Sequence, residues 1–197
     1  ACDPWMSLKR IEGIVARPLD AVAWAIHYPQ VQHLGMAELA TYPAATRQAV
    51  AAAQQQAAAG RYRDALDTLS TVPEADTNPA LAAFKAGALL GLGRVDAAEA
   101  LLARFAPHGD PAVDATVAVI QVARNDAGAL KTAGEAVSRA PESAPAQLAR
   151  SFALQAAGQV PAALDAARKA TALAPDNPLA HARQAELELS LGHTEAG

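Results

Sequence analysis

The 197-residue chain has one cysteine, few glycines and prolines, no long apolar run and no excess of positive charge. These features exclude several classes of protein. The single cysteine is Cys2, so no disulfide can form within the chain and a disulfide-bonded scaffold is excluded. Its 12 glycines and 13 prolines are spread thinly, which excludes collagen-like and low-complexity segments. No apolar run reaches the roughly 18–20 residues needed to span a bilayer. The formal net charge of −4 argues against general nucleic-acid binding, which depends on Lys and Arg neutralising phosphates.

Alanine supplies 54 of the residues, more than a quarter of the chain. Because alanine has the highest helix propensity, this composition predicts an all-α protein whose helices pack through small side chains. The length suits one domain or one continuous array of repeats.

Two series of residues recur with one period, which indicates an internal repeat. Prolines 73, 107, 141 and 175 are each separated by 34 residues. Glycines 60, 93 and 158 are each followed five residues later by an alanine, and Arg124-Asn125-Asp126 fills the slot of the missing glycine. Each unit therefore reads as two helices of roughly 12–14 residues joined by a short turn, where glycine can adopt a positive φ. The alanines that follow, at 65, 98, 129 and 163, are the expected contacts between the two helices.

The repeat resembles the tetratricopeptide repeat (TPR) family, and the best copy retains Ser151, Leu154, Gly158, Ala163 and Pro175. In the first two copies the second helix reaches proline early. The resemblance implies an all-α, right-handed superhelical solenoid of helix hairpins, with a non-repeat N-terminal segment over residues 1–45. The expected units of the 46–197 array are residues 46–78, 79–109, 110–143, 144–177 and a partial 178–197. Because the last unit is incomplete, we expect the natural chain to continue.

Residues 1–45 do not follow the repeat and hold both tryptophans and two of the three tyrosines. Residues 7–15 alternate loosely and predict a short strand or extended arm. Asp20 is a good N-cap for a helix over residues 21–28, on which Trp24 and Tyr28 share a face. These two side chains either dock the segment on the first repeat as a cap, which we favour, or anchor a partner.

The run from residue 17 to residue 29 is similar to a segment of bacterial proteins that join a FecR-like periplasmic domain to tetratricopeptide repeats. The resemblance implies an extracytoplasmic bacterial protein. We therefore expect the bacterial periplasm or envelope, with the cytoplasm as the alternative.

No motif for chemistry stands out, so we expect neither enzymatic activity nor a metal or cofactor. The five histidines show no metal-binding spacing, and no Gly-x-Ser-x-Gly motif is present. Mixed charges on the second helices are typical of a solvated convex face.

In the TPR family the first helix of each pair lines a concave groove. The resemblance assigns eight side chains to a partner-binding groove here: Arg47, Val50, Gln54, Gln121, Leu148, Phe152, Gln155 and Glu186. This surface lacks the clustered basic and amide side chains that clamp a C-terminal carboxylate in chaperone-binding relatives. We expect it to accept an apolar or helical protein segment, and part of residues 1–45 could fill it, from the same chain or a neighbour.

The leading hypothesis is a non-catalytic scaffold for a protein or peptide partner in a bacterial envelope or signalling complex, without nucleic-acid binding or membrane insertion. A self-assembling structural module is one alternative. An accessory region of a larger receptor or enzyme is the other.

Overall fold

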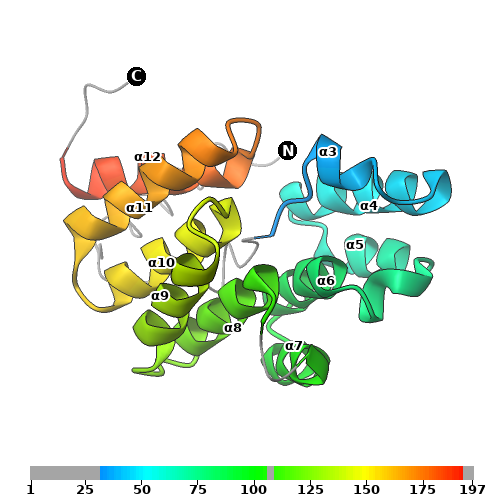
Figure 1. The fold of residues 1–197 in the computed structure, drawn as a ribbon, viewed down its shortest axis with the longest axis horizontal. Coiled ribbons are helices and arrows are strands. Elements are labelled where there is room, and N and C mark those ends of the chain that lie inside the picture. Colours follow the sequence, from blue (N-terminus) through cyan, green and yellow to red (C-terminus); the bar gives the residue numbers. More distant parts are fainter. Residues whose placement is uncertain (1–31, 106–108, 193–197) are drawn as a thin grey trace, which may run out of the picture.

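A computed structural model describes residues 32–105 and 109–192, and within these ranges every regular element is a helix (Figure 1). The expected strand at residues 7–15, the helix at residues 21–28 and the side chains of Trp24 and Tyr28 lie outside the described residues. The predicted all-α fold is confirmed for the part of the chain that is described.

In the described part of the chain, the helices form four hairpins followed by a single helix. The first helices of the units are α4 (Ala44–Ala58), α6 (Pro79–Gly91), α8 (Pro111–Ala123), α10 (Ala144–Ala156) and α12 (Pro178–Ser190). The second helices are α5 (Tyr62–Leu69), α7 (Val95–Leu102), α9 (Ala129–Arg139) and α11 (Val160–Leu173). A one-turn helix, α3 (Met36–Leu39), precedes the array, and 3-10 turns η1 (Pro73–Asp76) and η2 (Ala103–Phe105) follow α5 and α7.

Most first helices begin with the same local signal, a capping side chain followed by proline. The cap oxygen accepts a hydrogen bond from a first-turn N–H, and proline is tolerated there because its position has no helical acceptor for an N–H. This pattern starts α6, α8, α10 and α12, with the caps Asn78, Asp110, Ser143 and Asn177.

The hairpin turns have the left-handed backbone that the glycine series predicts. Gly158 has a φ of 74° between α10 and α11, and the corresponding glycines of the other hairpins are similar. In the hairpin without a turn glycine, Asn125 takes the position with a φ of 56°. Asparagine is among the few residues that tolerate this conformation, so the turn survives the loss of glycine.

Second helices of the first two hairpins are shorter than expected. Both α5 and α7 have 8 residues, not 12–14. Pro73 follows α5 closely and begins the 3-10 turn η1, which explains the early end of that helix. The later second helices α9 and α11 have 11 and 14 residues.

Small side chains make up much of the buried core, in which alanine is the most frequent residue type. The four alanines predicted as helix contacts are buried. Ala65, Ala98 and Ala163, each the fourth residue of its helix, are 0% exposed, and Ala129, which is the first residue of α9 and not one turn into it, is 4% exposed. Their burial agrees with the prediction that these alanines lie at helix contacts, where a larger side chain would hold the helices apart.

Successive helices pack against one another, and α8 also contacts α6 and α10, so the hairpins stack into a solenoid. Figure 1 shows the stack as an arc, with α3 near one end and α12 at the other. No helix among the described residues is long and apolar enough to cross a bilayer.

Candidate partner-binding site on the inner surface

The eight side chains assigned to the groove have different environments. Five are buried: Val50, Leu148, Phe152, Gln155 and Glu186. Arg47 is exposed, and Gln54 and Gln121 are half-buried. In this conformation a partner could reach only these last three. Gln121 faces a smaller cavity of about 250 Å³ that it shares with Glu99 and Arg124, away from Gln54.

The C-terminal part of the inner surface is closed by a buried charged network centred on Arg183 of α12. Arg183 Nη1 donates to Glu186 Oε2 at 2.6 Å, and Nη2 donates to Gln155 Oε1 at 2.9 Å. Its Nε donates to Ser151 Oγ at 3.0 Å, and the guanidinium lies 4.1 Å from the centroid of the Phe152 ring. Three of the assigned groove residues, Phe152, Gln155 and Glu186, therefore contact one arginine of the same chain.

Burial controls the electrostatics of this network. It lowers the pKa of Arg183, against the opposing pull of Glu186. It also raises the pKa of Glu186, and Arg183 partly counters that rise. A buried ion pair with several further hydrogen bonds is destabilised strongly when one partner is removed, because the other charge is left without compensation.

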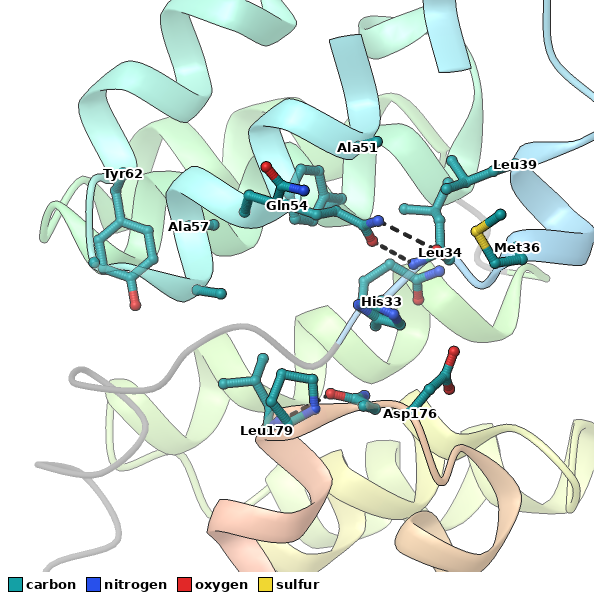
Figure 2. Close-up of a pocket in the computed structure, with 17 residues that line it drawn as sticks. His33, Leu34, Met36, Leu39, Ala51, Gln54, Ala57, Tyr62, Asp176 and Leu179 are labelled. Carbon is teal, nitrogen blue, oxygen red and sulfur yellow. Dashed lines mark hydrogen bonds between the residues drawn. The ribbon is translucent and has the colours of Figure 1, made fainter. Parts of the chain in front are cut away.

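The N-terminal part of the inner surface is organised differently, around Gln54 of α4. The backbone N–H of Leu34 donates to Gln54 Oε1 at 2.7 Å, and Gln54 Nε2 donates to the Leu34 carbonyl at 3.2 Å. The side-chain amide thus pairs with both polar groups of one residue, as a neighbouring β-strand would. Figure 2 shows both hydrogen bonds as dashed lines.

Leu34 completes this contact with its side chain. It is 1% exposed and belongs to a buried cluster with Val50, Ala53 and Phe84. Part of the N-terminal segment of this chain is therefore held by a residue that the sequence assigned to the groove.

A cavity of about 500 Å³ lies next to this contact. One wall is formed by residues around α3 and α4, including His33, Met36 and Gln54, and the opposite wall by residues 176–179 at the start of α12. Figure 2 shows Asp176 and Leu179 facing His33 and Leu34 across it. The curvature of the solenoid thus brings its two ends to one site.

Apolar side chains form much of the lining, and two buried amides have unused hydrogen-bonding atoms there. Gln32 is 5% exposed, and its Oε1 has no partner among the described residues. Asn177 is 1% exposed; its Oδ1 accepts from the Leu179 N–H at 3.0 Å, while its Nδ2 has no partner in the described part of the chain. Both residues line the cavity.

The charge of the lining is set by His33 and Asp176. Burial lowers the pKa of His33, and the nearby Asp176 opposes this effect only in part. The imidazole is therefore mainly neutral at pH 7. Within residues 32–105 and 109–192, no group of three or more His, Cys, Asp or Glu side chains is arranged to hold a metal ion. Apart from Asp176, the polar side chains of the lining, which include Gln32, Asn177 and a neutral His33, suit recognition of uncharged polar groups.

Sequence reasoning identified Gln54 but missed Gln32, His33, Met36, Asp176 and Asn177. Asn177 precedes a proline in the same way as Asn78, so its role as a helix cap could have been predicted. Its position opposite Gln32 depends on the curvature of the whole array, which no local pattern encodes.

The comparisons with known proteins bear on the fold. The structure is similar to the crystal structure of a thermophilic TPR protein from Thermus thermophilus, with a TM-score of 0.57 and 25% sequence identity, over 75% of this chain and 83% of that one. No protein-family model matches the chain, and no curated protein matches it. The similarity confirms the predicted TPR-like solenoid. It also supports a protein-interaction scaffold in general. Proteins of this fold are typically non-catalytic.

Proposed function

We propose that this chain is a non-catalytic scaffold that binds an extended, apolar segment of a partner protein at the cavity between the α3–α4 region and the start of α12. The observation that carries the proposal is the pairing of Gln54 with both backbone groups of Leu34. The inner surface already holds the backbone of one apolar residue outside any helix in this way, and that residue belongs to its own chain.

The geometry favours an extended segment over a helical one. In a helix, interior N–H and C=O groups are used by the helix itself and are not available to a side-chain amide. Gln54 instead takes both groups from a single residue, Leu34, and the next residue, Gly35, has the extended dihedrals φ −69° and ψ 166°. A segment bound alongside it would use main-chain hydrogen bonds for affinity and apolar side chains for specificity.

The rim of the cavity supplies an apolar contact. Met36 lines the cavity and is 79% exposed, the most exposed of the large apolar side chains in the described residues. Methionine is flexible and adapts to different apolar partners. A partner segment that covered Met36 would remove this side chain from water.

The proposed setting is a bacterial envelope or signalling complex, in the periplasm. Its support is the resemblance of residues 17–29, which lie outside the described residues, to the linker of FecR-like TPR proteins. Fractionation of cells producing the natural protein, with cytoplasmic and periplasmic markers, tests this. Recovery with the cytoplasmic marker would reject the periplasmic assignment.

Selection of peptides from a random library on the full chain tests the binding function. We expect enrichment of peptides with apolar residues and no central proline. Binding should be lost in Ala58→Trp, because Ala58 is exposed and lines the cavity, so the indole would obstruct it. The matched control is Ala59→Trp, an exposed neighbour outside the cavity lining, which should bind normally. No enrichment, or equal binding by both variants, would reject the proposal.

A further inference from the structure

The cavity contains two buried amides whose free atoms have opposite hydrogen-bonding character. We propose that Gln32 and Asn177 form a subsite for one peptide group of the partner segment, in which Asn177 Nδ2 donates to the peptide carbonyl and Gln32 Oε1 accepts from the peptide N–H. This inference rests on the proposed function and names the group recognised.

Asn177 is a buried amide with its oxygen in use and its nitrogen unpaired among the described residues. The residue is 1% exposed, and its Oδ1 is committed to capping α12 through the Leu179 N–H. A serine or an aspartate performs the same capping at α10 and α8, so capping alone does not require the amide nitrogen. The Nδ2 is buried beside the cavity without a partner among the described residues. A buried donor left unpaired costs free energy, which a carbonyl placed in the cavity would recover.

Gln32 supplies the complementary acceptor. It is 5% exposed, and its Oε1 has no partner in the described part of the chain. It lies two residues before Leu34, the residue whose backbone Gln54 holds, so it is fixed to the wall of the cavity. A peptide group carries one donor and one acceptor and is the commonest protein group that satisfies both atoms.

The surroundings favour a neutral ligand over an anion. Oxygen Oε1 of Gln32 would repel a carboxylate or phosphate, and the exposed carboxylate of Asp176 lies in the same lining. Burial also lowers the pKa of His33, which keeps this side chain neutral at pH 7. A neutral amide meets no charge repulsion here, whereas an anion does.

The subsite also links two distant parts of the chain. Gln32 precedes α3 at one end of the array, and Asn177 starts α12 at the other. A peptide group held by both would fix the distance between the two ends. Binding should therefore restrain the two ends of the array relative to each other as well as fill the cavity.

The test uses the full chain, labelled with nitrogen-15, and the capped tripeptide acetyl-Ala-Leu-Ala-amide as the probe. NMR titration follows the side-chain amide signals of Gln32 and Asn177 and gives the Kd. Asn177→Asp keeps the capping oxygen but removes the donor, and Gln32→Met removes the acceptor at similar size. We expect each to weaken binding about tenfold, in keeping with the loss of one hydrogen bond to a buried amide.

The matched control is Asn78→Asp, which changes an equivalent helix cap outside the cavity lining and should change Kd less than about twofold. Methylation of the leucine nitrogen in the probe should weaken binding to the unaltered chain but add little to the loss in Gln32→Met.

Three results would overturn the subsite. One is absence of binding by the unaltered chain, and another is binding by Asn177→Asp and Gln32→Met that is as tight as that of the unaltered chain. The third is a nuclear Overhauser contact between the Asn177 amide and residues 1–31 in the free protein, which would assign the subsite to this chain's own segment. If Asn177→Asp and Gln32→Met bound normally while Ala58→Trp lost binding, the subsite would be rejected and the proposed function would stand. Equal binding by Ala58→Trp and Ala59→Trp would reject the proposed function itself.

Discussion

The two ends of the inner surface use glutamine in different ways. At the C-terminal end, Gln155 accepts from Arg183 and donates to Glu186 at 3.4 Å, so it belongs to a closed network of side chains. At the N-terminal end, Gln54 holds the backbone of Leu34 beside an open cavity. Both glutamines lie on first helices. Gln155 is occupied by charged side chains of α12 and Gln54 by the backbone of Leu34, but only Gln54 borders the open cavity.

This contrast separates a structural role from the proposed binding role. The charged network stabilises the packing of α12 on α10, and its residues are buried. The N-terminal end combines a cavity, unpaired amide atoms and an exposed methionine. Changes at the first end should therefore mainly alter stability, and changes at the second should mainly alter binding.

The largest effect is expected from Arg183→Met. It leaves Glu186 buried without its cation, and should lower the free energy of unfolding by about 3–5 kcal/mol, as for other broken buried ion pairs. Arg47→Met, at an exposed position on the inner surface, should change it by less than about 0.5 kcal/mol. Urea denaturation measures both.

The double variant Arg183→Met with Glu186→Leu removes both charges and should recover much of that loss. If Arg183→Met were no more destabilising than Arg47→Met, the account of the closed end would be wrong.

A smaller effect is expected from Gln54→Ala, which removes both hydrogen bonds to Leu34. The free energy of unfolding should fall by about 1–2 kcal/mol, and the Leu34 amide should exchange with solvent faster. Gln54→Glu keeps an acceptor for the Leu34 N–H and loses the donor, so exchange should rise less.

Gln48→Ala, at an exposed position on the same helix, is the control and should leave exchange at Leu34 unchanged. Unaltered exchange at Leu34 in Gln54→Ala would show that the backbone of this segment does not depend on the glutamine.

The smallest effect concerns pH. Because the pKa of His33 is lowered in the folded state, the unfolded chain binds a proton first as pH falls through about 6.5, and folding stability decreases. His33→Gln should lose less stability than the unaltered chain between pH 8 and pH 5.5 in thermal unfolding. The difference isolates His33 from other titrating groups, such as Glu38, whose pKa is raised by burial. If the stability of His33→Gln and of the unaltered chain fell in parallel with pH, the lowered pKa of His33 in the folded state would be contradicted.

The sequence predicted much of the fold because its signals are local. The turn glycines, the alanines at the helix contacts and the prolines of the first turns each report on a few neighbouring residues. Even the hairpin without a turn glycine followed the pattern, since Asn125 tolerates the same conformation.

The site was less predictable because it depends on long-range geometry. Gln54 was identified from its place on a first helix. Its hydrogen-bond partner, Leu34, precedes the repeat and follows no sequence pattern. Phe152 and Gln155 were assigned to the same groove. In the structure Arg183 covers the Phe152 ring and donates a hydrogen bond to Gln155. This contact depends on how α12 packs against α10, which no local sequence pattern predicts.

Photo-crosslinking would locate the bound partner segment on the inner surface. A photoreactive phenylalanine analogue at Met36, on the rim of the cavity, should crosslink a library-selected peptide. The same analogue at Leu92, which is 38% exposed and outside the cavity lining, should not. Crosslinking at Leu92 with none at Met36 would contradict the assignment of partner binding to the N-terminal end of the inner surface.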